Sequence, residues 1–130
     1  MRSTSLWRNA ILALVILPVL LEAGARGDIF RWDNNQLVPG TAGITPAAGI
    51  DLSNWNTPGH DLEYANLTYN LTGATFANSD VSFALFASSS ASLSSATFTN
   101  AIITGANFSG MTARGFINTQ LYSTASYATN

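Results

Sequence analysis

The densest group of residues capable of chemistry is His60, Asp61 and Glu63. An imidazole beside carboxylates could act as an acid–base pair or supply half of a metal site. Neighbouring residues of an extended strand point to opposite faces, so we expect the side chains of His60 and Asp61 to diverge. The chain has this one histidine, no cysteine and no lysine. We therefore predict a structural role for His60, and no catalytic, cofactor-binding or metal-binding residue.

Three further kinds of site lack their defining residues. The segment Asp51-x-Ser53-x-Trp55 lacks the acidic residues and the bidentate glutamate of a calcium loop. The serines have neither a G-x-S-x-G elbow nor a second histidine, as nucleophilic catalysis would require. No glycine-rich phosphate loop followed by lysine is present. The sequence predicts that the protein is not an enzyme and uses no cofactor.

Charged residues are scarce and mostly acidic. From residue 28 onward, two arginines accompany six acidic residues, which leaves a net charge of −4. Binding to nucleic acid requires clustered Lys and Arg, so we expect no nucleic-acid partner. The lack of cysteine excludes disulfides, thiolate zinc sites and iron–sulfur clusters.

The N-terminus is typical of a secretory signal peptide. Arg2 and Arg8 precede the apolar run 10–21, and small residues follow at 23–27. The run is shorter than the about 20 residues that a spanning helix needs, and it contains Pro18. We expect removal of residues 1–25 or 1–27, no membrane attachment afterwards, and a secreted, periplasmic or cell-envelope location. The alternative is an uncleaved anchor.

A period of five residues dominates the rest of the chain. From residue 74 the sequence divides into blocks such as ATFAN, AIITG and ANFSG, each with a large apolar residue at its third position. Seven of the ten residues that lie two positions before these block centres are alanine. The ten centres are Leu62, Leu67, Leu71, Phe76, Val81, Phe86, Leu93, Phe98, Ile103 and Phe108.

This period matches neither a helix nor a strand, but a chain that turns a corner every five residues. Each block would point one large and one small side chain inward, and four blocks would close a coil. Successive coils would then stack at the β-sheet spacing of about 4.8 Å. Treating Ser89-Ser90 as a bulge predicts three stacked pairs: Phe76 with Phe98, Val81 with Ile103, and Phe86 with Phe108. Leu93 would stack on Leu71 or, if Leu71 is not a true centre, on Leu67.

The blocks resemble the A-(D/N)-L-x-x unit of pentapeptide-repeat proteins. The resemblance covers roughly residues 50–117 and implies an all-β fold, a short right-handed quadrilateral β-helix. The segments DIFRWDNNQLVPGT and GFINTQLYSTASY are also similar to segments of secreted bacterial members, many from planctomycetes. Those proteins continue with further repeats, and some with a sorting tail, so the resemblance implies a shortened paralogue.

Four regions follow from these patterns: a signal peptide (1–27), an irregular N-terminal cap (28–49), the repeat solenoid (50–117) and a C-terminal cap (118–130). Open solenoid ends aggregate unless they are covered. We expect Phe30, Trp32 and Trp55 to plug one end; the alternative is an exposed aromatic surface for sugars or partners. At the other end we expect a short helix with Asn118 or Thr119 as N-cap, in which Leu121 and Tyr122 cover the last coil.

The favoured function is an exported, non-catalytic structural or protein-interaction module. Its partner would be an unknown protein or envelope component, and its oligomeric state is open. Two alternatives remain. The first, which the resemblance implies because some pentapeptide-repeat proteins act in this way, is a DNA-mimicking inhibitor of a topoisomerase. The other is a shortened paralogue without a retained role.

Overall fold

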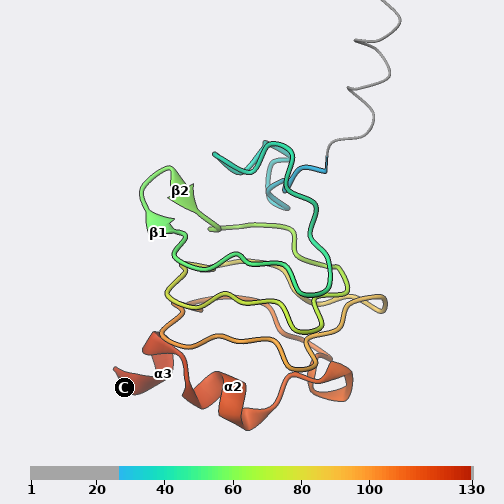
Figure 1. The fold of residues 1–130 in the computed structure, drawn as a ribbon, viewed down its shortest axis with the longest axis vertical. Coiled ribbons are helices and arrows are strands. Elements are labelled where there is room, and N and C mark those ends of the chain that lie inside the picture. Colours follow the sequence, from blue (N-terminus) through green and yellow to red (C-terminus); the bar gives the residue numbers. More distant parts are fainter. Residues whose placement is uncertain (1–26, 130) are drawn as a thin grey trace, which may run out of the picture.

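Stacked coils form the body of the protein (Figure 1). The computed structural model describes residues 27–129. Parallel β-bridges join successive coils, and most join residues 22 apart, as in Thr75–Thr97 and Asp80–Ile102. Backbone N–H groups of one coil donate to carbonyls of the next; for example, the N–H of Phe76 lies 2.8 Å from the oxygen of Thr97. This arrangement confirms a β-helix-type fold.

Four columns of block centres fill the interior, and each column defines one side of the coil. The predicted stacks are present: the rings of Phe76 and Phe98 lie 5.0 Å apart, and the bridge Asp80–Ile102 aligns Val81 with Ile103. The bridge between residues 70 and 92 makes Leu71 a true centre, stacked on Leu93. The centres are Leu52, Phe76 and Phe98 on side one; Leu62, Val81 and Ile103 on side two; Leu67, Phe86 and Phe108 on side three; and Leu71 and Leu93 on side four.

Tight turns make the corners between sides. The N–H of Ser79 donates to the carbonyl of Phe76, and Asn78 between them has a φ of +56°. A type II turn requires a positive φ at this third position, which favours Gly and Asn. The inward small residue that follows each turn is buried in most blocks. His60 and Tyr69 are exceptions to the predicted pattern, because both are exposed.

A hairpin interrupts the first coil. Strand β1 (Asn56–Thr57) pairs antiparallel with β2 (His60–Asp61), and Pro58-Gly59 forms the tip. The hairpin lies between the centres Leu52 and Leu62, whose ten-residue spacing imitates two blocks in the sequence. His60 therefore belongs to the hairpin, and this explains why its side chain does not point inward.

The C-terminal cap consists of the 3₁₀ turn η1 (Thr112–Arg114), α2 (Asn118–Tyr122) and α3 (Ala125–Ala128), which lie beneath the last coil (Figure 1). The predicted N-cap is wrong: Ile117 occupies that position, and its N–H donates to Oε1 of Gln120 at 2.6 Å. Gln120 Nε2 also donates to the carbonyls of Leu93 and Ala96, each at 2.8 Å. Gln120, a buried residue that was not predicted to have a role, therefore supplies hydrogen-bond donors to carbonyls at the end of the last coil.

The residues predicted to cover the two ends behave differently from one another. Leu121 packs against the core as expected, but Tyr122 is 51% exposed and lies beside Tyr127. At the N-terminal end Trp55 is buried, whereas Phe30 and Trp32 are 46% and 47% exposed. The prediction of an aromatic plug at the N-terminal end is therefore wrong for Phe30 and Trp32, and the predicted covering of the last coil is wrong for Tyr122.

Smaller apolar residues cover the first coil instead. Ile29 and Val38 are buried, and the N–H of Val38 donates to the carbonyl of Ile29. No helix within residues 27–129 is both long and apolar enough to cross a bilayer. The predicted signal peptide lies outside these described residues, apart from its last position.

Candidate functional site

His60 lies against an aromatic ring and apart from the carboxylates that follow it. Its imidazole stacks on the indole of Trp55, with ring centroids 3.9 Å apart and planes 17° from parallel. Asp61 points to the other side of the strand, where its Oδ1 accepts the N–H of Glu63 at 3.2 Å. The strand thus separates the two side chains in the way its alternation predicts, and they form no acid–base pair.

Three carboxylates gather in a hollow of about 300 Å³ on side two. Asp61, Glu63 and Asp80 line it together with residues 56–58 of the hairpin. Burial raises the pKa of Glu63, and the nearby charges of Asp80 and Asp61 raise it further. Within residues 27–129, no group of three His, Cys, Asp or Glu side chains has an arrangement suited to a metal ion. The hollow is therefore a patch of mutually repelling negative charge.

An aromatic column lies at the corner beside these carboxylates. The rings of Tyr64 and Phe83 stack with centroids 4.9 Å apart, and the guanidinium of Arg31 lies 4.4 Å from the centroid of Tyr64. Trp32 joins them, because its indole N–H donates to the carbonyl of Phe83 at 2.7 Å. Arg31 also pairs with Asp33 at 2.8 Å, and this hydrogen-bonded pair lowers the pKa of Asp33.

This column was not predicted, although the repeat register contains a sign of it. Counting two residues beyond Leu62 and Val81 places Tyr64 and Phe83 at corner positions, where Asn78 and Asn100 stand in other blocks. A bulky aromatic residue is unusual where the backbone needs a positive φ. Two such exceptions on the same side would have marked the surface.

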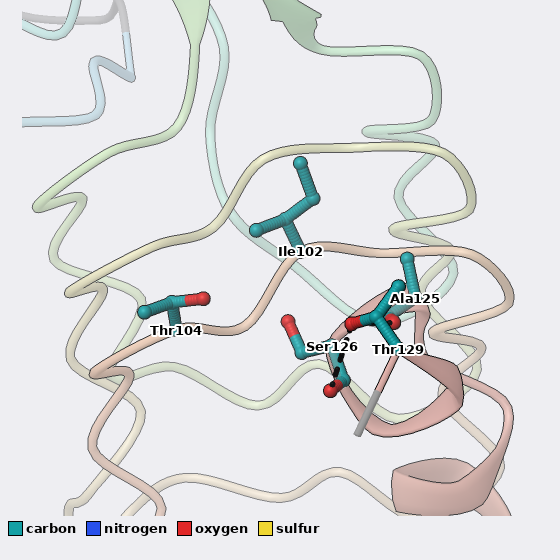
Figure 2. A pocket seen from close by; sticks show the side chains of 5 residues that line it. All are labelled: Ile102, Thr104, Ala125, Ser126 and Thr129. Atoms are coloured by element: carbon teal, nitrogen blue, oxygen red, sulfur yellow. Dashed lines mark hydrogen bonds between the residues drawn. The ribbon is translucent and has the colours of Figure 1, made fainter.

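A second hollow, of about 590 Å³, lies lower on side two, between the last coil and α3 (Figure 2). Ile102 and Thr104 approach it from the coil, and Ala125, Ser126 and Thr129 from the helix. Ser126 Oγ accepts the N–H of Ile103 at 2.9 Å, which ties α3 to the coil. Aliphatic groups and hydroxyls line this hollow, without a titratable side chain, so it offers packing space and no acid–base chemistry.

Comparison with known protein families agrees with the five-residue register. Residues 91–115 match the family model of pentapeptide repeats (8 copies). The match supports the repeat family that the sequence resembles, and pentapeptide repeats are typically non-enzymatic interaction modules. A search of curated proteins and a search of solved structures returned no match.

Proposed function

We propose that this chain is an exported, non-catalytic protein-interaction module of the secreted bacterial pentapeptide-repeat type, built on a right-handed quadrilateral β-helix. The observation that supports it most is the register of the stacked coils. Block centres and the small residues two positions before them are mostly buried, in four columns of centres, while other residues between the centres face outward. Such a scaffold holds a row of surface side chains in fixed positions and leaves them free for contacts.

The placement of the titratable groups supports a non-catalytic role. Acid–base catalysis requires a group whose pKa is tuned by burial in a cleft that also holds the substrate. The carboxylates within residues 27–129 are all exposed or half-buried, and His60 is exposed on its hairpin. Glu63, whose pKa is raised, has two further acids beside it and no imidazole, thiol or hydroxyl nucleophile oriented by it.

Export is inferred from residues 1–27 and can be tested directly. Intact-mass analysis or N-terminal sequencing of the protein recovered from the native envelope or medium should show a chain that starts between residues 26 and 28. A recovered chain that still begins at Met1 would contradict cleavage. Recovery from the cytoplasm alone would contradict export.

The interaction role is tested by affinity capture of the tagged, exported protein after crosslinking in its native envelope or medium. We expect specific proteins to be enriched over a bait that carries the tag alone. No enrichment in either fraction would contradict the proposal. Inhibition of DNA supercoiling by the purified protein would favour the DNA-mimic alternative. One observation counts against that alternative: the row of carboxylates on side two ends at Asp80, because Ile102 is the residue aligned with Asp80 in the next coil.

A further inference from the structure

Side two combines exposed aromatic rings with clustered carboxylates. We name the following group the side-two surface: Trp32, Tyr64, Phe83, Asp61, Glu63 and Asp80. The aromatic and acidic residues alternate along the chain, since Tyr64 follows Glu63 and Phe83 lies three residues after Asp80. Apart from Trp32, which comes from the N-terminal cap, both halves of the surface therefore lie on the same two neighbouring coils.

Tyr64 and Phe83 occupy corners where folding alone favours other residues. Their φ angles are +58° and +57°, and such values are uncommon for large side chains. At other repeat corners the same position holds Asn, Gly or Ser, as at Asn78 and Gly73. Asn and Gly adopt this conformation more readily. The corner turns therefore do not explain why two large rings lie here.

The rings form a rigid apolar corner whose faces are already covered. Tyr64 is enclosed between Arg31 and Phe83, and Phe83 lies between Tyr64 and the backbone of Gly105. Phe83 remains 40% exposed and Trp32 47% exposed. A sugar ring that stacks on aromatic residues needs an open ring face, which Tyr64 and Phe83 do not offer. The surface suits an apolar side chain that packs against ring edges and the indole of Trp32.

The charge beside this corner is negative and only partly offset, by Arg31, whose charge acts to lower the pKa of Glu63. The one ion pair in residues 27–129 joins Arg31 to Asp33, so no such pair neutralises Asp61, Glu63 or Asp80. Burial raises the pKa of Glu63, and the charges of Asp80 and Asp61 raise it further, as expected of carboxylates that repel one another. Positive charge brought by a partner would relieve that repulsion. Arg31 already shows a cation held by an aromatic face and a carboxylate at this corner.

We propose that the side-two surface binds an extended basic peptide segment of a partner protein, in which Lys or Arg lies two residues from a large apolar side chain. This inference rests on the proposed interaction role and names the chemistry of its partner. The basic side chain meets the three carboxylates, and the apolar one packs against Phe83 and Trp32. The chain turns a corner between Val81 and Ala84, so Asp80 and Phe83 lie closer together than three fully extended residues would. Residues two apart in an extended peptide lie about 7 Å from one another and point to the same face, which suits this spacing.

The test uses the full chain and short fluorescent peptides in an anisotropy titration. The probe repeats Lys-Ser-Leu-Ser, which places lysine and leucine two residues apart and on the same face of an extended chain; one control peptide has glutamate for lysine, and another has alanine for leucine. We expect binding of the lysine–leucine peptide that weakens with added salt. Phe83→Asn and Glu63→Gln should each weaken it about tenfold, as for central contacts of an interface.

Matched variants on other sides should leave affinity within about twofold. Tyr69→Asn removes an exposed aromatic ring elsewhere, and Asp51→Asn removes a carboxylate from side one. Phe83→Asn is expected to fold, because asparagine already stands at the equivalent corners 78 and 100. Its melting curve checks this before the titration.

Several outcomes would overturn the proposal. They are no binding of the lysine–leucine peptide, equal binding of the glutamate peptide, and equal losses in the side-two and control variants. Displacement by a soluble polysaccharide would assign the surface to sugars instead. Dimers of the wild type that Phe83→Asn converts to monomers would assign it to a second copy. Affinity capture distinguishes this proposal from the more general interaction role. If Phe83→Asn and Glu63→Gln still capture the same partners, the protein is an interaction module, but its partners do not bind the side-two surface.

Discussion

The ring of Phe83 lies directly over Gly105 of the next coil. A Cβ at Gly105 would come within 2.6 Å of two carbons of that ring, closer than real Cβ contacts allow. Gly105 also has a φ of +67°. The aromatic column on side two therefore ends at Gly105, where glycine is required both for the positive φ and for the absence of a side chain.

Gly105→Ala should destabilise the protein for two separable reasons. The left-handed backbone costs about 1–2 kcal/mol for a residue with a Cβ, and displacement of Phe83 adds to it. Gly73→Ala is the matched control, since Gly73 has a φ of +70° and open space around it. Urea unfolding should show a larger loss at 105 than at 73. Adding Phe83→Asn to Gly105→Ala should remove the excess; an excess that persists would locate the clash elsewhere.

Phe98→Asp should prevent folding, whereas Thr99→Asp should be tolerated. Phe98 is fully buried and stacked on Phe76, and Thr99 is exposed. An ionised carboxylate without a partner costs several kcal/mol when buried, comparable with the about 5–15 kcal/mol that stabilise a whole domain. Circular dichroism and solubility measure the difference. Similar melting of the two variants would contradict the assignment of inward and outward positions.

Gln120→Met should lower the free energy of unfolding by about 1–3 kcal/mol. Methionine keeps the length of the side chain but removes the bonds to Leu93, Ala96 and Ile117. The carbonyl of Ala96 would then face the cap without a donor. Thr119→Ala, at an exposed neighbouring position, is the control and should change little. Equal stability of the two variants would show that packing alone closes this end.

Glu63→Gln should stabilise the protein at neutral pH and flatten the dependence of its stability on pH. Since the pKa of Glu63 is raised in the folded state, this residue destabilises the fold above that pKa and stops doing so as the pH falls below the unfolded value. Because Glu63 is partly exposed and screened by solvent, the gain should be less than about 1 kcal/mol.

Asp51→Asn should act in the opposite direction. Hydrogen bonds from Ser53 lower the pKa of Asp51, so its contribution is favourable above the unfolded value and is lost as the pH falls through the lowered one. Thermal unfolding between pH 3 and 7 separates the two variants. Parallel pH profiles for both would contradict these assignments.

Repetition made the interior predictable from sequence. A side chain that recurs every five residues leaves few ways to turn the chain, so the pairs Phe76–Phe98 and Phe86–Phe108 followed from counting blocks. The ring centroids of Phe86 and Phe108 lie 4.7 Å apart. The hairpin around His60 was missed, because its length preserved the apparent phase between Leu52 and Leu62.

The caps and the candidate surface were less predictable because they depend on single, unrepeated contacts. Trp32 is large and apolar, which suggests burial, yet its indole N–H donates to the carbonyl of Phe83 and its side chain stays about half exposed. A glutamine in a short helix is expected at the surface, but the side chain of Gln120 is directed inward because it donates to the carbonyls of Leu93 and Ala96 in the last coil. Neither contact has a counterpart elsewhere in residues 27–129 from which it could have been inferred.

The corner asparagines have a consequence for how the chain can change in length. The side-chain amide of Asn78 donates to Asn54 in the preceding coil, and the amide of Asn100 donates to Asn78 from the following coil. Asn78 therefore makes the same kind of hydrogen bond to the coil on either side of it. Duplication of the segment 76–97 would add one coil and restore every bond at the new junction, since Phe98 and Thr97 already occupy the positions of Phe76 and Thr75. Growth and shrinkage in steps of 22 residues are therefore compatible with the fold, whereas the bridges Asp51–Thr75 and Asn66–Leu85 show that coils of other lengths need local insertions or deletions.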